Sequence, residues 1–444
     1  MNSPRNRWRR SAIVGIPLVA ALALSGCAAG GGADPDTVTD ECPDGVITLN
    51  GISSSAGYPS DSQVAEFQET HSCVNVEIQR VPFDQLAETI SVQASGSAPL
   101  DLIGYDGPWT KNLASQGVLL PLDDYVSEEW LDDVLESTLT EHSWEGALYS
   151  TGIQTSAMMM YYNKTMTDAA GIEVPQTLED GWTWPEAYEA FQTCQQGPAS
   201  SPTVWGLAGT RYGTGAINTA LPILRSAGDP DAKEGSEAYN TYYAISEDGT
   251  TADGYLNTPS AIEAATFYQK MFNGDTAVSP QTPIPDSFLN QTACFDIDIP
   301  YLANDLNEAN VDFEWGVTTV PYFTTPTVHT GSITIGVASK SKHADAAAEF
   351  VVAISEHDAL MRYAEETNIV PVLNSVIDEM PAMHEFPLAV AVEQLREWGV
   401  PRPQTTGFFA YDQYVTDALA DIAYGADPED RLNQAVDQLA DHLK

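Results

Sequence analysis

The chain has 444 residues, of which 63 are acidic and 18 are basic, so its formal net charge is −45 at pH 7. Such an acidic excess argues against nucleic acid and bulky anions as partners, because both carry negative charge themselves. A chain of this length is too long for one hydrophobic core, so two domains are expected.

The N-terminus has the features of an export signal. Four arginines lie among the first ten residues, and the apolar stretch over residues 12–24 is too short to span a membrane stably. Leu24-Ser25-Gly26-Cys27 then resembles the lipobox of bacterial lipoproteins, in which the cysteine is acylated and becomes the new N-terminus. This resemblance implies a signal peptide over 1–27, a lipid on Cys27 and a flexible tether over 28–41. An ordinary signal peptide with a chance cysteine is the alternative.

Strands and helices are expected to alternate over residues 46–106. Apolar strands are predicted at 46–52, 74–81 and 100–106, with helices beginning near residues 63 and 84. This order implies a parallel sheet with helices on both faces, and ligands of such sheets bind beyond the carboxyl ends of the strands. The candidate ligand residues at these ends are Ser54, Ser55, Tyr105, Asp106 and Trp109.

Four cysteines besides Cys27 favour two disulfides in an exported chain. Cys42 and Cys73 each lie just before a predicted strand, and adjacent parallel strands would bring their starts together. We therefore predict a Cys42–Cys73 bridge, which leaves Cys194 to pair with Cys294. Free buried thiols are the alternative.

Residues 157–162 form a continuous apolar run between a polar trio at 154–156 and Asn163-Lys164. A short run of this kind suits a strand buried on both faces. At about 3.3 Å per residue, an extended segment over 148–164 is long enough to leave one domain and enter another. A core strand within a single domain is the alternative.

Several motifs in chain order resemble one protein family. The first hinge of bacterial extracellular solute-binding proteins has the pattern seen here at 146–164, namely Gly-x-x-Tyr, a polar patch, an apolar strand and Tyr-Asn-Lys. Segments 98–103, 117–122 and 368–371 also match family patterns, as does Trp-Thr-Trp at 182–184, with Thr183 as a candidate helix N-cap. The resemblance covers essentially the whole mature chain and points to the carbohydrate-binding branch that includes maltose-binding protein.

The resemblance implies a two-lobed α/β fold of the periplasmic-binding-protein type, with a mainly parallel sheet flanked by helices in each lobe. The expected N-terminal lobe comprises 42–156 and 297–341, and the C-terminal lobe comprises 157–296 and 342–444. Three crossings are expected, near Thr155, Ile297 and Lys342.

The resemblance also implies further cleft residues. Tyr212 aligns by order with a cleft aromatic of the family, Tyr301 takes the place of its usual tryptophan, and one of Phe408 or Phe409 would form a sugar platform. Trp182 and Trp184 are interpreted as packing residues. The other candidates are Ser156, Arg211, Asp298, Gly331, Ser332 and Arg402.

Three functions remain open at this point. The family implies a non-enzymatic, cofactor-free and metal-free lipoprotein of an ABC importer. It would be monomeric, lie on the extracellular face of the membrane, capture a sugar or oligosaccharide between its lobes and deliver it to the permease. A binder of a non-sugar solute such as a polyamine is the first alternative. The second is a secreted hydrolase with two carboxylates about 5–9 Å apart, for which Asp296 and Asp298 on one strand face are candidates.

Overall fold

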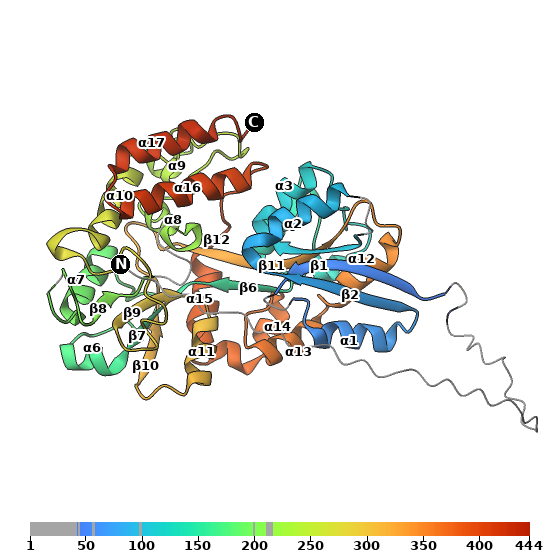
Figure 1. Cartoon of the computed structure of the whole chain (residues 1–444), viewed down its shortest axis with the longest axis horizontal. Coiled ribbons are helices and arrows are strands. Elements are labelled where there is room, and N and C mark those ends of the chain that lie inside the picture. The colour runs from blue at the N-terminus through green and yellow to red at the C-terminus, as the bar shows by residue number, and fades with distance from the viewer. Residues whose placement is uncertain (1–41, 43–44, 56–57, 97–99, 199, 210–215) are drawn as a thin grey trace, which may run out of the picture. The chain divides into compact units, whose positions relative to one another are not determined.

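Two β-sheets organise the computed structural model, which describes residues 42, 45–55, 58–96, 100–198, 200–209 and 216–444. The first sheet has the order β12-β11-β3-β1-β2, with β6 also paired to β11 (Figure 1). Its strands are β1 (Ile47–Ser54), β2 (Val74–Val81), β3 (Leu102–Asp106), β6 (Gln154–Ala157), β11 (Val328–Val337) and β12 (Gly399–Val400). The second sheet has the order β10-β7-β9-β8. Its strands are β7 (Met159–Asn163), β8 (Trp205–Leu207), β9 (Ala293–Asp298) and β10 (Trp315–Thr318). A separate hairpin joins β4 (Ser143–Trp144) to β5 (Ala147–Leu148).

The first sheet begins as predicted. Strand β1 pairs in parallel with β2, in register from Ile47 with Val74, and with β3 on its other side. Gly51 lies in the middle of β1, where an added Cβ would meet the Ile78 side chain at 2.4 Å. A glycine is therefore needed for β1 to pass so close to its neighbours.

Helices cover both faces of this sheet, and the sheet and its helices together form the first lobe. One core contains Leu49 and Leu102, and the other contains Ile52 and Ile103. The helices and turns of this lobe are α1 (Asp61–Thr70), α2 (Phe83–Ser95), η1 (Gly107–Trp109), α3 (Thr110–Ser115), α4 (Glu128–Asp133), α5 (Glu136–His142), α12 (Ala344–Ala353) and α13 (His357–Thr367).

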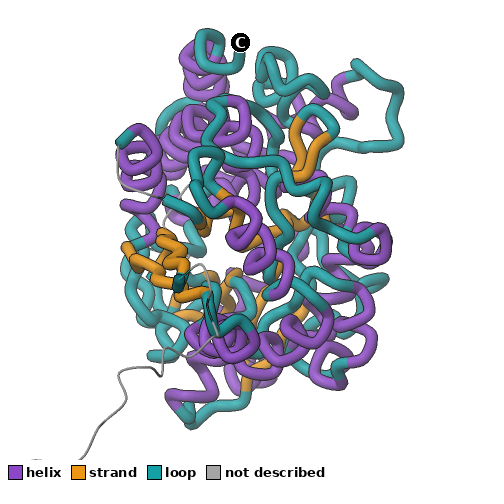
Figure 2. Tube along the Cα trace, turned by 90° about the vertical axis from the view of Figure 1, so that its right-hand side faces the viewer, coloured by secondary structure: helices purple, strands orange, loops and turns teal. Residues whose placement is uncertain are grey.

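The second sheet and its helices form the second lobe around one large core. Figure 2 shows the molecule turned by 90°, with helices in purple around the strands in orange. The helices are α6 (Lys164–Ala170), α7 (Trp184–Cys194), α8 (Ile217–Arg225), α9 (Glu237–Tyr243), α10 (Pro259–Phe272), η2 (Gly274–Thr276), α11 (Tyr301–Ala309), α15 (Leu388–Trp398), α16 (Phe408–Ala423) and α17 (Pro428–Leu439). Helix α14 (Asn374–Glu379) and the turn η3 (Pro381–His384) lie in sequence between the first-lobe helix α13 and the second-lobe helix α15. Val376 of α14 packs into a first-lobe core, and Met383 of η3 packs into the second-lobe core.

The chain passes from the first sheet to the second at Met158. Strand β6 pairs with β11, whereas β7 begins one residue after β6 ends and pairs with β9 and β10. Every residue of β7 is buried, because the strand lies in the middle of its sheet with core on both faces. The predicted helix start at Thr183 is also present, as a capping box with Glu186.

The predicted lobe boundaries differ from the sheets in two places. Strand β10, within 297–341, pairs with β7 and so belongs to the second sheet. Helices α12 and α13, within 342–444, pack Phe350 and Tyr363 into a first-lobe core. The chain therefore adds one more strand to the second sheet before β11, and it leaves the first lobe later than Lys342.

The cysteines are paired. Cys194, at the end of α7, is bonded to Cys294 in β9 with a Cα–Cα distance of 6.2 Å, as predicted. Cys42 and Cys73 are each disulfide-bonded too, as the other predicted pair requires. Cys27, with the predicted signal and tether, lies outside the described residues. Within the described part of the chain, no helix is both long and apolar enough to cross a membrane.

Candidate binding site

Asp106 and Arg402 form a buried ion pair at the edge of the first sheet. Asp106 ends β3, and Arg402 follows the short strand β12. Nη1 of Arg402 lies 2.7 Å from Oδ2 of Asp106, and Nη2 lies 2.6 Å from Oδ1. The Arg402 side chain is only 9% exposed and the Asp106 side chain only 14%. This two-pronged geometry is the strong form of a charge-assisted hydrogen bond, so both predicted residues lie together.

Aromatic rings lie beside this pair. Trp109 in η1 contacts Phe409 with ring centroids 5.1 Å apart and Phe83 with centroids 5.6 Å apart. Phe409 is half-buried and Trp109 is buried. A partly covered ring next to polar groups suits a ligand with an apolar face.

Two predicted ligand residues belong to the core instead. Phe408 is 1% exposed and packs in the same cluster as Trp109. Tyr105 is fully buried there, its hydroxyl lies 3.3 Å from Oγ1 of Thr110, and burial raises its pKa to about 12. Of the two candidate platform residues, this leaves Phe409 as the more accessible one. The residue order gave no indication of which side of β3 and α16 faces the core.

Gln154 on β6 lies at the centre of a second cluster of polar side chains. Its side-chain amide lies 3.2 Å from the Tyr301 hydroxyl and also accepts a hydrogen bond from Tyr363. Burial raises the pKa of Tyr301 and of Tyr363. Tyr301 was predicted, but Gln154 and Tyr363 were not named as ligand residues. Gln154 stood in the polar trio before the apolar run, and this was the signal that could have identified it.

The serines at the strand ends differ in exposure. Ser54 is buried, whereas Ser55 is exposed. Ser156 is half-buried and lies opposite Gly331, where an added Cβ would come within 2.9 Å of its hydroxyl. Gly331 therefore leaves room for Ser156 and contributes no side chain.

Asp298 has a structural contact at the second crossing. It is 1% exposed, and its Oδ1 accepts the backbone N–H of Ile299 at 2.8 Å, where the chain turns into α11. Arg211 and Tyr212 lie outside the described residues.

Ser332 lies in a buried group that sequence reasoning did not find. Its hydroxyl lies 3.0 Å from Nε2 of His142 and forms a short hydrogen bond with Oε2 of Glu141. Burial raises the pKa of Glu141 to about 7, although the charge of Arg402 opposes this. Among more than sixty acidic residues, nothing in the local sequence distinguishes Glu141.

Arg225 fixes the segment that carries Arg402. Its Nη1 donates to the carbonyl of Pro401 at 2.9 Å and lies 2.8 Å from Nε2 of His329. Burial, with the nearby Arg225 charge, keeps the pKa of His329 well below its usual value, so the neutral ring accepts this hydrogen bond. His329 therefore has a structural contact, and Arg225 was missed.

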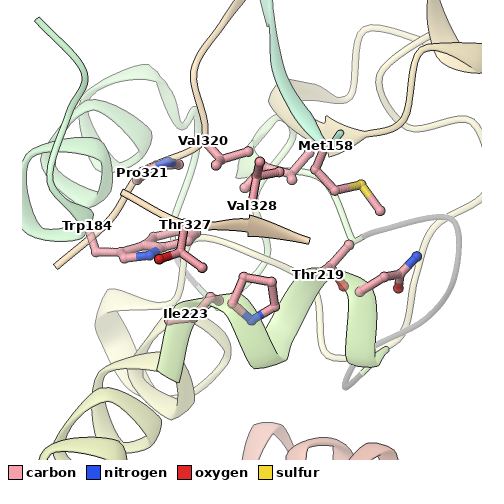
Figure 3. Close-up of a pocket in the computed structure, with 11 residues that line it drawn as sticks. Met158, Trp184, Thr219, Ile223, Val320, Pro321, Thr327 and Val328 are labelled. Atoms are coloured by element: carbon pink, nitrogen blue, oxygen red, sulfur yellow. The ribbon is translucent and has the colours of Figure 1, made fainter. Parts of the chain in front are cut away.

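The hollow drawn in Figure 3 is a different feature. It lies in the second lobe between α8 and the ends of β9 and β11, and is lined by Met158, Trp184, Ile223 and Val328 among others. Its volume of about 20 Å³ has room for one water molecule, not for a sugar ring. Trp184 is 3% exposed here, in keeping with its predicted packing role.

Two α/β lobes with polar and aromatic side chains at the strand ends, where the chain passes between sheets, define the solute-binding class of protein. The family of bacterial extracellular solute-binding proteins matches residues 51–361, and this chain belongs to that family.

Relatives extend over most of the chain. A binding protein of Brucella abortus is 24% identical over 342 residues, which are 73% of this chain and 75% of that protein. The galactooligosaccharide-binding protein of Bacillus subtilis is 21% identical over 395 residues, 86% of each chain. The solved structure of an ABC substrate-binding protein of Listeria monocytogenes in complex with cycloalternan superposes with a TM-score of 0.74 at 20% identity, covering 89% of this chain and 98% of that chain. At this identity the likeness shows the fold.

Proposed function

We propose that the protein captures a sugar or oligosaccharide for an ABC importer and delivers it to the membrane permease. The observation that carries the proposal is the buried Asp106–Arg402 pair with Trp109 and Phe409 beside it. A carboxylate accepts hydrogen bonds from sugar hydroxyls, a guanidinium donates to them, and the rings cover the CH faces of the sugar. The names of relatives that bind galactooligosaccharide and cycloalternan support the same class of ligand.

A sugar is favoured over a polyamine because the Asp106 carboxylate is already neutralised by Arg402. A cationic ligand would have to compete with a two-pronged ion pair at the place where its charge would bind. A thermal-shift screen distinguishes the two classes. The panel comprises maltose, maltotriose, cycloalternan and galactooligosaccharides against putrescine and spermidine. We expect a shift with at least one sugar, whereas a shift with polyamines alone would overturn the proposal. Release of reducing sugar from the panel would instead indicate a hydrolase.

The proposal includes a lipid anchor on Cys27 at the extracellular face of the membrane, and a monomeric protein. Leu24-Ser25-Gly26-Cys27 supports the anchor. In cells that express the full chain, Cys27→Ala should move the protein from the membrane fraction to the soluble exported fraction. Continued membrane association of the variant would contradict the anchor.

A further inference from the structure

A continuous hydrogen-bonded chain of side chains lies behind Arg402. Ser332 on β11 stands between His142 and Glu141 of α5, and Oγ1 of Thr330 lies 3.4 Å from Oε1 of Glu141. All these side chains are buried, Glu141 at 1% and His142 at 0% exposure.

Gly107 makes this arrangement possible. A Cβ at Gly107 would come within 1.8 Å of the Ser332 hydroxyl and 2.9 Å of both Oε2 of Glu141 and Nε2 of His142. No side chain larger than hydrogen fits at this position. The η1 turn that follows Asp106 therefore packs directly against the Ser332 hydroxyl. The Asp106–Arg402 pair and the buried group around Ser332 are thus adjacent.

The Ser332 hydroxyl has a single proton to share between two partners. When Glu141 is ionised, the hydroxyl donates to the carboxylate, so the neutral His142 ring must carry its proton on Nε2 and donate to Ser332. When Glu141 is protonated, its O–H donates to Ser332, whose own proton then turns to Nε2, and the ring carries its proton on Nδ1. One proton enters from solvent, and the ring keeps one N–H in both states.

The surrounding charges set where this exchange occurs. Burial raises the pKa of Glu141 to about 7, while Arg402 opposes the rise and Asp106 adds to it. Burial lowers the pKa of His142 to about 3, so the ring stays neutral throughout. Asp412 on α16 also faces Arg402, and burial raises its pKa to about 6. Lys111 on α3, an element that packs against α5, has a pKa lowered by burial.

We propose that the ionisation of Glu141 is coupled through Ser332 to the tautomer of His142. Gly107 packs directly against all three side chains, so this exchange takes place against the turn that follows Asp106. The coupling concerns only the unliganded chain and does not rest on the proposed function.

Nitrogen NMR on the unliganded protein with ¹⁵N-labelled histidine tests the coupling. His142 is assigned by loss of its signals in His142→Gln. Between about pH 5 and about pH 9 we expect its proton to move from Nδ1 to Nε2 with a midpoint of about 7.

Two variants should abolish this step. Glu141→Gln removes the ionisation, and Ser332→Ala removes the link while it leaves the carboxyl in place. Glu136→Gln, an exposed position on the same helix, should retain the step, as should Asp412→Asn. A His142 tautomer that does not change with pH in the wild type would overturn the proposal. So would a step that persists in both Glu141→Gln and Ser332→Ala. Because no sugar is added, these results do not depend on whether the screen above finds a ligand.

Discussion

Phe408 and Tyr411 lie one turn apart on α16, yet they pack into different hydrophobic cores. Phe408 inserts into the first-lobe core that contains Trp109, whereas Tyr411 is buried in the second-lobe core and donates to the carbonyl of Ala244 at 2.8 Å. The start of α16 therefore holds the two lobes at the same edge where Arg402 binds Asp106. On the proposed function, the side chains at this edge divide between those that contact the ligand and those that support them.

Phe409→Ala should weaken sugar binding with little effect on stability. Its half-buried ring faces Trp109 beside the ion pair, and the loss of an aromatic platform worth about 2 kcal/mol corresponds to roughly thirtyfold in affinity. Phe408→Ala is the matched comparison, because truncating a fully buried phenylalanine costs about 3–5 kcal/mol of stability. Calorimetric titration with the sugar identified in the screen and denaturant melts measure both quantities. If Phe409→Ala binds as tightly as the wild type, this ring is not part of the site.

Arg402→Ala should destabilise the fold and abolish tight binding. The substitution leaves the Asp106 carboxylate buried without its partner, which costs about 3–5 kcal/mol in comparable pairs. Arg396→Ala is the control, because that arginine pairs with Asp378 at the surface, where such a pair is worth about 1 kcal/mol or less. Urea unfolding curves of the two variants make the comparison. Equal losses would show that the Asp106–Arg402 pair is solvated in solution.

The stability of the protein relative to Glu141→Gln should depend on pH. The pKa of Glu141 is about 7 in the folded protein and about 4.5 in the unfolded chain. Between these values the folded protein retains a proton that the unfolded chain has released, so this group makes the protein less stable as the pH rises through that range. The free energy of unfolding of Glu141→Gln, relative to that of the wild type, should therefore rise by about 3 kcal/mol as the pH increases from about 4 to about 8.

His142 has the opposite sign, because its lowered pKa makes the folded protein more stable as the pH rises from about 3 to about 6.5. This contribution is present in both proteins and cancels in the comparison. Chemical denaturation at several pH values gives the difference. A difference between variant and wild type that stays constant with pH would show that Glu141 ionises as it does in water.

Removal of the Cys194–Cys294 bridge should destabilise the second lobe. The cysteines are 100 residues apart in sequence, and in the chain-entropy model closing such a loop is worth up to about 4.7 kcal/mol. Replacing both cysteines by alanine should lower the melting temperature, as measured by calorimetry under non-reducing conditions. A melting temperature equal to that of the wild type would show that the unfolded chain is already restricted without the bridge.

The amino-acid sequence by itself determined the local features of this protein. The parallel start β1-α1-β2-α2-β3, the capping box at Thr183 and the apolar run over 157–162, most of which lies in β7, all depend on side chains close together in sequence. Apolar periodicity and capping chemistry act over a few residues, so they can be recognised without the fold. The Cys194–Cys294 pair followed because a single partner remained for each cysteine.

Only the tertiary structure decided which side chains meet at the site. Asp106 and Arg402 are 296 residues apart, and Glu141 and Ser332 are 191 apart. The sequence placed Asp106 and Arg402 near a cleft, but it did not reveal that they bind each other or that Glu141 lies behind them. It also could not show that Phe408 faces a core while Phe409 does not. Burial and ion pairing arise when distant segments exclude water from one another, and no local pattern of residues carries that information.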